Sequence, residues 1–259
     1  MSDDATLKAS SFEKFVPLLS IAVIALVFVV GVMWQKINNL EKGVKGTTTQ
    51  QAQATNVPVK LDQIKELFSK DLIKFGDANA KVLFVEVSDP SCPYCHIAAG
   101  TNKELIKQYY KDQEYLAPEP EMRRLVEEGK ASFVYIYMSG HGNGEMGMKA
   151  LYCAYEQGKF WETHDILFTS AGYTLMNETI KNDTTQSQKL ADFLKKAVDT
   201  TRLKECLDSG KYDARLASDA QISASLGVTG TPGFYINTSN FPGAYGYDQM
   251  KPVIEEALR

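Results

Sequence analysis

The most constraining feature of the sequence is a change of pattern between residues 81 and 95. Residues 81–87 (KVLFVEV) form a nearly continuous run of β-branched, aliphatic and aromatic side chains, which is typical of a strand covered on both faces in a parallel sheet. Four turn-forming residues, 88–91, end this run, and the pattern that follows is helical. Cys92 and Cys95 are therefore expected at the end of a buried strand and the start of a helix.

Two further apolar runs predict that this strand belongs to a larger sheet. Residues 133–138 (FVYIYM) and 233–237 (GFYIN) have the same strand-like composition. The helical pattern after Cys95 connects the first two strands as a β-α-β unit. These patterns place residues 58–138 and 229–259 in one α/β domain.

The segment between the second and third of these strands, residues 139–228, contains no convincing strand-like run. It carries several amphipathic helical patterns, and a structureless connection of about ninety residues is not expected in a compact domain. We therefore predict an inserted helical domain. Within it, His141 is interpreted as a turn or cap residue and His164 as a packing residue rather than a metal ligand.

The sequence Cys92-Pro93-Tyr94-Cys95 predicts thiol chemistry at the strand-to-helix junction. Unpaired backbone N–H groups and the helix dipole stabilise a thiolate at a helix N-terminus and lower its pKa from about 8.5 to roughly 3.5–7. Cys92 is the expected thiolate, and Cys95, one turn later, can close a reversible disulfide with it. Pro93 fixes the backbone of the first helical turn. We interpret the pair as one attacking and one resolving thiol.

The main alternative is half of a structural zinc site, which needs four ligands, usually as two close pairs. The remaining cysteines, Cys153 and Cys206, are 53 positions apart, and the three histidines show no suitable spacing. We therefore predict no metal site from the cysteines and histidines. The sequence does not decide whether carboxylates around Asp77 or Asp89 bind a metal ion. Because the net charge is −4 and no long basic block is present, nucleic acid is not an expected partner.

An uncharged segment near the N-terminus predicts a membrane anchor. A helix rises about 1.5 Å per residue, and the hydrocarbon core of a bilayer is about 30 Å thick. A helix formed by residues 15–34 (FVPLLSIAVIALVFVVGVMW) is therefore long enough to span it. We expect a transmembrane helix, preceded by a cytoplasmic tail (1–14) and followed by a flexible linker (35–57). A cleaved signal peptide is the alternative, but no small-x-small site follows the run. The flanking lysines do not settle the orientation.

Three separated segments resemble, in order, the DsbA-like thiol-disulfide oxidoreductases of the thioredoxin superfamily, particularly the anchored BdbD type. These segments are FGDANAKVLFVEVSDPSCPYCH, ALYCAYEQGKFWETHDILF and GVTGTPGFYIN, and the resemblance spans residues 57–259. It implies a thioredoxin fold with an inserted helical domain. The strand and helix patterns described above agree with that fold.

The resemblance implies a role for Glu86, which lies where the family has a buried acid beneath the active-site disulfide. Its neighbours Val85 and Val87 also favour burial over a surface position. Burial raises the pKa of a carboxyl group, which suits Glu86 to exchange a proton with Cys95.

The resemblance also implies that Thr231 and Pro232 form the family's cis-proline pair beside the active site. The exposed backbone of such a loop can bind an extended client peptide as an added strand. Together with Pro93 and Tyr94, this pair makes up the expected client-binding surface.

Similar proteins can carry a second disulfide in the inserted domain, and we predict that Cys153 and Cys206 are paired. Two free, buried cysteines are the alternative. A bridge would favour an oxidising compartment, and therefore a catalytic domain on the extracytoplasmic side of a cell membrane.

The position of His96, directly after Cys95, allows two interpretations. It could be a residue that tunes the Cys92 thiolate or a solvated helix residue.

The predicted function is that of a membrane-anchored enzyme that introduces disulfide bonds into cysteine-containing client proteins without a separate cofactor. The resemblance implies reoxidation by a quinone-linked membrane partner of the DsbB or vitamin-K-epoxide-reductase type. A reductase or isomerase of the same fold is one alternative, because Pro93 and Tyr94 supply no cation and also occur in glutaredoxins. A redox-inactive peptide-binding or chaperone module is another.

Overall fold

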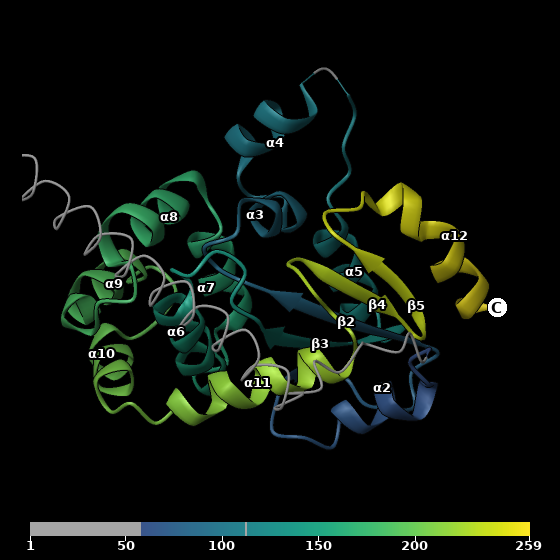
Figure 1. Ribbon diagram of the computed structural model, residues 1–259, viewed down its shortest axis with the longest axis horizontal. Coiled ribbons are helices and arrows are strands. Elements are labelled where there is room, and N and C mark those ends of the chain that lie inside the picture. The colour runs from purple at the N-terminus through teal and green to yellow at the C-terminus, as the bar shows by residue number, and fades with distance from the viewer. Residues whose placement is uncertain (1–57, 112) are drawn as a thin grey trace, which may run out of the picture. The chain divides into compact units, whose positions relative to one another are not determined.

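The computed structural model of the protein describes residues 58–111 and 113–259 (Figure 1). The expected tail (1–14), anchor (15–34) and linker (35–57) lie outside the described residues. Within the described ranges, no helix has both the length and the apolar character that crossing a bilayer requires.

A five-stranded sheet with the order β1-β3-β2-β4-β5 forms the centre of the described fold. Only β2 and β3 are parallel, and the other neighbours pair antiparallel. Every residue of β2 and β3 is buried, which explains why their sequences read as continuous apolar runs. The strands are β1 (Ile73–Phe75), β2 (Val82–Ser88), β3 (Ala131–Tyr137), β4 (Gly233–Ile236) and β5 (Ser239–Pro242).

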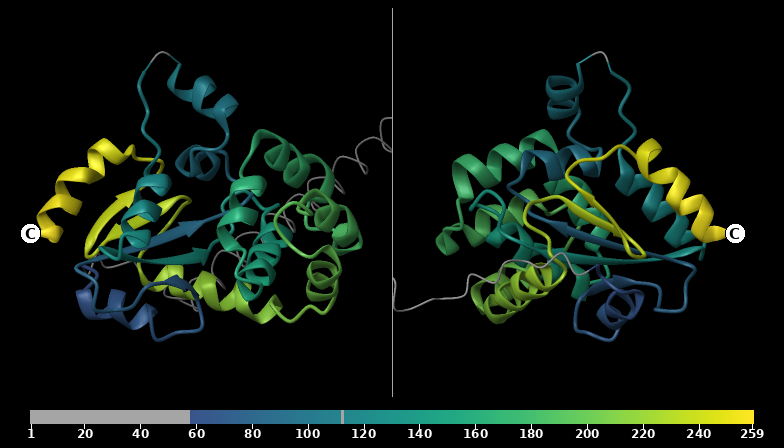
Figure 2. Two further views of the ribbon diagram at one scale, coloured as in Figure 1. Left: turned by 180° about the vertical axis from the view of Figure 1, so that it is seen from behind. Right: turned by 45° about the vertical axis from the view of Figure 1, so that its right-hand side comes forward.

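Helices cover both faces of this sheet, as the two views of Figure 2 show. The connection from β2 to β3 contains α3 (Pro93–Ala99), α4 (Lys103–Tyr110) and α5 (Pro118–Glu127). The first and last helices of the described chain are α2 (Leu61–Leu67) and α12 (Tyr247–Leu258). The segment between β3 and β4 contains α6 (Glu145–Glu156), α7 (Phe160–Leu167), α8 (Ser170–Thr174), the π-helix η2 (Leu175–Ile180), the 3-10 helix η3 (Thr184–Gln186), α9 (Ser187–Phe193), α10 (Thr200–Asp208) and α11 (Asp213–Ser225).

The alternation of side chains along β2 divides the apolar core into two parts. Leu83, Val85 and Val87 pack on one face of the sheet with residues of α2 and α11. Phe84 lies in the larger core on the opposite face, which includes residues of α3, α5, α6 and α7. Glu86 and Ser88 share the face of Phe84, so two polar side chains of the strand enter the larger core.

The helical segment between β3 and β4 joins the same core as the sheet. Tyr152 of α6 and Leu203 of α10 belong to the larger core together with Phe84. Helix α11, at the end of the expected insertion, is fixed to β3, because the backbone N–H of Tyr137 donates to the Asp219 carboxylate at 3.1 Å. The aromatic residues of α7 pack against the larger core and the ring of Phe75.

Candidate active site

The Cys92–Cys95 pair lies where the turn after β2 leads into α3. Cys92 is the N-cap residue with an extended backbone (φ −81°, ψ 124°), and Pro93 is the first helical residue. The backbone N–H of Cys92 donates to the carbonyl of Asp89 at 2.9 Å, and the N–H of His96 donates to the carbonyl of Cys92 at 3.2 Å. Both thiols are free and buried.

The two thiols have pKa values shifted in opposite directions. A hydrogen bond with the Cys95 thiol is the largest effect that lowers the pKa of Cys92, which reaches about 6, and the Thr231 side chain, the Cys95 backbone and the charge of His141 act in the same direction. Burial raises the pKa of Cys95 well above its ordinary value. Near neutral pH, Cys92 is therefore ionised and Cys95 holds its proton. The hydrogen bond between the two thiols and the burial of Cys95 are the largest causes of this asymmetry.

The loop before β4 brings a distant part of the chain beside Cys92. The Thr231–Pro232 peptide bond is cis. The Sγ atom of Cys92 lies 3.3 Å from the carbonyl oxygen of Thr231. The carbonyl of Pro232 accepts from the N–H of Gly243 at 2.8 Å, which links this loop to the residue after β5. The structure thus places Thr231 and Pro232 next to the redox pair.

A buried carboxylate, Asp89, holds together two loops of the site. Its Oδ1 atom accepts from the backbone N–H (2.8 Å) and the hydroxyl (2.7 Å) of Ser91, and its Oδ2 atom accepts from the N–H groups of Gly140 (2.6 Å) and His141 (2.8 Å). A Cβ atom at Gly144 would lie 1.8 Å from Asp89 Oδ1, so only glycine fits this approach. Asp89 therefore fixes the turn before Cys92 against the loop that carries His141.

The side chains on the outer side of the pair differ in accessibility. Pro93 is buried, whereas the Tyr94 side chain is 42% exposed. The ring of Tyr94 packs edge-on against the exposed Tyr109 of α4, with centroids 5.1 Å apart. Of the two residues between the cysteines, Tyr94 is thus the one presented to an approaching molecule.

Two carboxyl groups of the described fold, those of Glu86 and Glu119, are buried. Glu86 of β2 is fully buried, and burial raises its pKa to about 8. Glu119 of α5 is also buried, and its pKa is raised well above the ordinary value by burial and by the charge of Glu86. Each group affects the pKa of the other, and none of their four carboxyl oxygens accepts a hydrogen bond from a donor among the described residues. The Ser88 hydroxyl lies near enough to lower the pKa values of both Glu86 and Cys95.

Sequence reasoning missed Ser88 and Glu119 as members of the site. Ser88 is two positions beyond Glu86 and shares its strand face, so the alternation of side chains along β2 was the available signal. Glu119 had no comparable signal, because it follows Pro118 at the start of a helix where an exposed acidic residue is ordinary.

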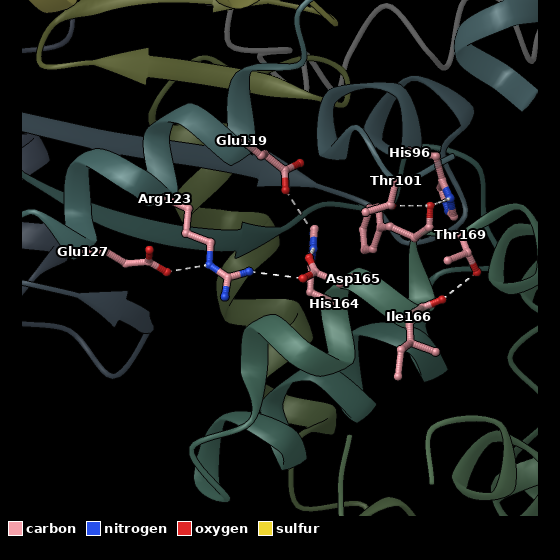
Figure 3. Close-up of polar contacts among 10 residues, drawn as sticks. His96, Thr101, Glu119, Arg123, Glu127, His164, Asp165, Ile166 and Thr169 are labelled. Carbon is pink, nitrogen blue, oxygen red and sulfur yellow. Dashed lines mark hydrogen bonds and ion pairs between the residues drawn. The ribbon is translucent and has the colours of Figure 1, made fainter. Parts of the chain in front are cut away.

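The three histidines have different surroundings. His96, which Figure 3 shows, is buried rather than solvated. Its Nδ1 atom lies 2.9 Å from the carbonyl oxygen of Phe168, and its Nε2 atom lies 2.8 Å from that of Pro90. Burial lowers the pKa of His96 to about 4, so the ring is neutral near pH 7 and connects α3 to the residue after α7. His141 is exposed and contributes charge to the Cys92 site. His164 is buried against Phe168, with ring centroids 4.1 Å apart.

Cys153 and Cys206 are joined by a disulfide bond, which connects α6 to α10. Neither helix carries the Cys92–Cys95 pair. Within residues 58–111 and 113–259, no group of three or more His, Cys, Asp or Glu side chains is arranged to hold a metal ion.

Comparison with solved structures shows the same fold. The oxidised form of BdbD from Bacillus subtilis superposes with a TM-score of 0.53 and 20% sequence identity, over 72% of this chain and 92% of that one. The α-DsbA1 protein of Wolbachia pipientis gives a TM-score of 0.53 and 18% identity, over 73% and 91% of the two chains.

Comparison of sequences finds two kinds of curated relative. Disulfide bond formation protein D of Bacillus subtilis is 24% identical over 191 residues, which cover 71% of this chain and 76% of that protein. The Na(+)/H(+) antiporter NhaA 3 of Salinispora tropica is 26% identical over 190 residues, but the chain spans only 24% of the antiporter's length.

The thioredoxin family matches residues 118–256, which is more than half of the chain. The matched segment contains Thr231 and Pro232 and begins after Cys95. With the sheet order, the cis-proline loop beside the redox pair and the shared fold of BdbD and α-DsbA1, this match shows that the chain belongs to the thioredoxin family and has the DsbA-type fold.

Proposed function

We propose that the protein is a membrane-anchored thiol-disulfide oxidoreductase that forms disulfide bonds in client proteins on the extracytoplasmic side of a cell membrane. The observation that carries this proposal is the unequal pair of thiols, with the pKa of Cys92 lowered to about 6 and that of Cys95 raised. A thiolate that is stable in the reduced enzyme is a good leaving group, which favours transfer of the disulfide to the client. The likeness to disulfide bond formation protein D supports the same reaction.

The proposed reaction is a two-step exchange of sulfur–sulfur bonds. A client thiolate attacks the Sγ atom of Cys92, and the Cys92–Cys95 bond breaks. Cys95 leaves with the electron pair and takes up a proton, and the buried Glu86 is the proposed donor. The second client thiolate then attacks the client sulfur of the mixed disulfide and expels Cys92 as a thiolate. The client loses two electrons and the enzyme pair gains them.

Client binding is proposed at the surface around Cys92. The backbone of Thr231 and Pro232 lies beside the thiol that a client would attack, and Tyr94 and Tyr109 supply exposed aromatic surface next to it. An extended segment around a client cysteine fits this arrangement, because backbone contacts do not depend on its sequence.

The proposal includes a partner that reoxidises the enzyme. Electrons left on Cys92 and Cys95 must pass to an oxidant, and we propose a quinone-linked membrane protein of the DsbB or vitamin-K-epoxide-reductase type. The uncharged run at residues 15–34 supports anchoring to the membrane that would hold this partner.

The equilibrium of the Cys92–Cys95 pair with glutathione tests the direction of the reaction. We expect a reduction potential close to that of DsbA, about −120 mV, because the reduced form is stabilised by the Cys92 thiolate. A potential close to that of thioredoxin, about −270 mV, would contradict the oxidase function and favour a reductase.

Variants of the two cysteines separate exchange from simple binding. We expect Cys95→Ala to accumulate mixed disulfides with clients, because the resolving thiol is absent, and Cys92→Ala to form none. If Cys92→Ala retained the full effect of the protein on client folding, the protein would be a binding module rather than an exchange enzyme.

A further inference from the structure

The peptide bond that leads into Cys92 is held by hydrogen bonds at both of its polar ends. Its N–H group, which belongs to Cys92, donates to the carbonyl oxygen of Asp89 at 2.9 Å. Its carbonyl group, which belongs to the buried Ser91, accepts from Nδ2 of Asn177 at 3.2 Å. Asp89 and Asn177 together therefore fix the orientation of this peptide.

Asn177 reaches this peptide from a distant part of the chain. It lies 86 positions beyond Ser91, in the π-helix η2, which follows directly on α8. Turns of π-helix are rare and occur frequently at functional sites. The helical segment between β3 and β4 thus contributes a side chain that holds the residue before Cys92.

The hydrogen-bond partners of the Asn177 amide select a single orientation for it. Its Nδ2 atom donates to the carbonyl oxygens of Ser91 at 3.2 Å and Tyr173 at 3.1 Å, and its Oδ1 atom accepts from Nδ2 of Asn143 at 3.3 Å. Carbonyl oxygens only accept hydrogen bonds, so the flipped amide would place its oxygen against two acceptors. Both N–H groups of the Asn177 amide are therefore used, one on its own helix and one on Ser91.

The loop that carries His141 joins the same set of contacts. The backbone N–H of Asn143 donates to the Ser91 hydroxyl at 3.3 Å, while that hydroxyl donates to the Asp89 carboxylate at 2.7 Å. The Asn143 side chain also donates to Asn177. Ser91 is thus the residue at which the turn before α3, the loop after β3 and η2 meet.

The position of the Cys92 thiol depends on the orientation of the preceding peptide. Cys92 has an extended backbone at the N-terminus of α3, and hydrogen bonds with the side chain and the backbone of Cys95 stabilise its thiolate. Among the described residues, Asn177 is the one hydrogen-bond donor to the Ser91 carbonyl. Removing its amide therefore releases one end of the peptide, and the direction in which Cys92 presents its side chain is no longer fixed.

We propose that Asn177 is a positioning residue of the redox pair, whose amide holds the Ser91–Cys92 peptide and thereby keeps the Cys92 sulfur next to the donors of Cys95. This inference rests on the proposed exchange of disulfides, in which Cys92 leaves as a thiolate. Asn177 acts through the backbone of Ser91, so it is not a catalytic residue.

An Asn177→Leu variant tests the proposal, because leucine has nearly the same size and no donor. Thiolate absorbance of the reduced full-length protein measures the pKa of Cys92, and we expect this pKa to rise by about 0.5 to 1 unit, the effect of one lost hydrogen bond. A less stable thiolate makes the reduced pair less stable. We therefore expect the equilibrium constant for reduction of the pair by glutathione at pH 8 to fall by about three- to tenfold, which corresponds to about 15 to 30 mV.

Thr179→Leu is the matched control, because it introduces the same side chain at an exposed position of the same π-helix. We expect its Cys92 pKa and its glutathione equilibrium to match those of the unmodified protein. A second variant, Asn177→Ala, removes the same donor without adding an apolar side chain. Its pKa and equilibrium constant should shift as those of Asn177→Leu do, because both variants lose the contact with Ser91.

Two outcomes would overturn the positioning role. If both variants of Asn177 kept the Cys92 pKa and the glutathione equilibrium of the unmodified protein, any loss of stability in urea would give Asn177 a purely structural role. Equal shifts in Thr179→Leu would assign the effect to η2 as a whole. The proposed function fails separately, on the potential of the unmodified protein, and the difference between that protein and Asn177→Leu would still decide the role of Asn177.

Discussion

At the scale of single residues, the chemistry of the site depends on which of its thiol and carboxyl groups carry a proton. The main chain fixes Cys92 and Cys95 at one end of α3, but their different pKa values come from side chains that belong to several elements. Glu86 is the buried acid on the strand below them, and burial makes its neutral form the favoured one. The same preference links the stability of the protein to pH.

A Glu86→Gln variant tests this link. Folding raises the pKa of Glu86 from 4.5 to about 8, so its contribution to stability is complete below pH 4.5 and is lost as the pH rises through about 8. An amide does not ionise, and we expect the variant to exceed the unmodified protein by about 3 kcal/mol in free energy of unfolding at pH 7, and to match it near pH 4. Urea titrations of the oxidised proteins, in which neither active-site thiol ionises, measure the difference.

The exposed Glu127→Gln variant serves as the control for this experiment, since its side chain is largely in water. Its free energy of unfolding should follow the unmodified protein across the pH range. Parallel curves for Glu86→Gln and the unmodified protein would show that Glu86 keeps its ordinary pKa after folding.

At the scale of elements, the site depends on one carboxylate that joins two loops. Asp89 accepts four hydrogen bonds, two from Ser91 in the turn before α3 and two from the backbone of Gly140 and His141 in the loop before α6. Both loops contribute to the environment of Cys92, because His141 lowers its pKa. Asp89 therefore fixes the turn before α3 against the loop that follows β3.

An Asp89→Asn variant should break this connection. One carboxylate oxygen becomes an NH₂ group that faces backbone N–H donors, so at least one pair of hydrogen bonds is lost. We expect the free energy of unfolding to fall by about 2 kcal/mol and the pKa of Cys92 to rise, as measured by urea titration and by thiolate absorbance. Asp77→Asn, at an exposed turn, should change the stability by less than about 0.5 kcal/mol. An Asp89→Asn variant as stable as the Asp77→Asn control would contradict this role.

The elements of the site differ in how far the sequence predicts them. Local patterns predicted β2, α3 and the junction that holds Cys92 and Cys95, because these depend on neighbouring residues. The resemblance to known proteins, not the local pattern, suggested the loop at Thr231 and Pro232. Contacts such as Asp89 with Gly140, or Glu86 with Glu119, join segments more than thirty positions apart. No periodicity in the sequence encodes such pairings.

At the scale of the whole described fold, the helical segment between β3 and β4 and the sheet share one core. The helical patterns of residues 139–228 predicted the presence of this segment. They did not predict that α11 would bond to β3 through Asp219, since an amphipathic pattern identifies a buried face but not its neighbour. The Cys153–Cys206 disulfide lies within this segment and links two of its helices, α6 and α10.

Removal of this disulfide should affect global stability and leave the redox pair in place. The bridge closes a loop over a sequence separation of 53 residues, and loop closure of that length stabilises a folded chain by about 4 kcal/mol through the unfolded state. We expect a Cys153→Ala/Cys206→Ala variant to lose up to about this free energy of unfolding in urea, and its glutathione equilibrium at Cys92 and Cys95 to be unchanged, because neither α6 nor α10 carries the pair. A loss of unfolding free energy below about 1 kcal/mol would mean that the bridge does little to restrict the unfolded chain. An altered glutathione equilibrium would mean that the helical segment affects the redox properties of Cys92 and Cys95.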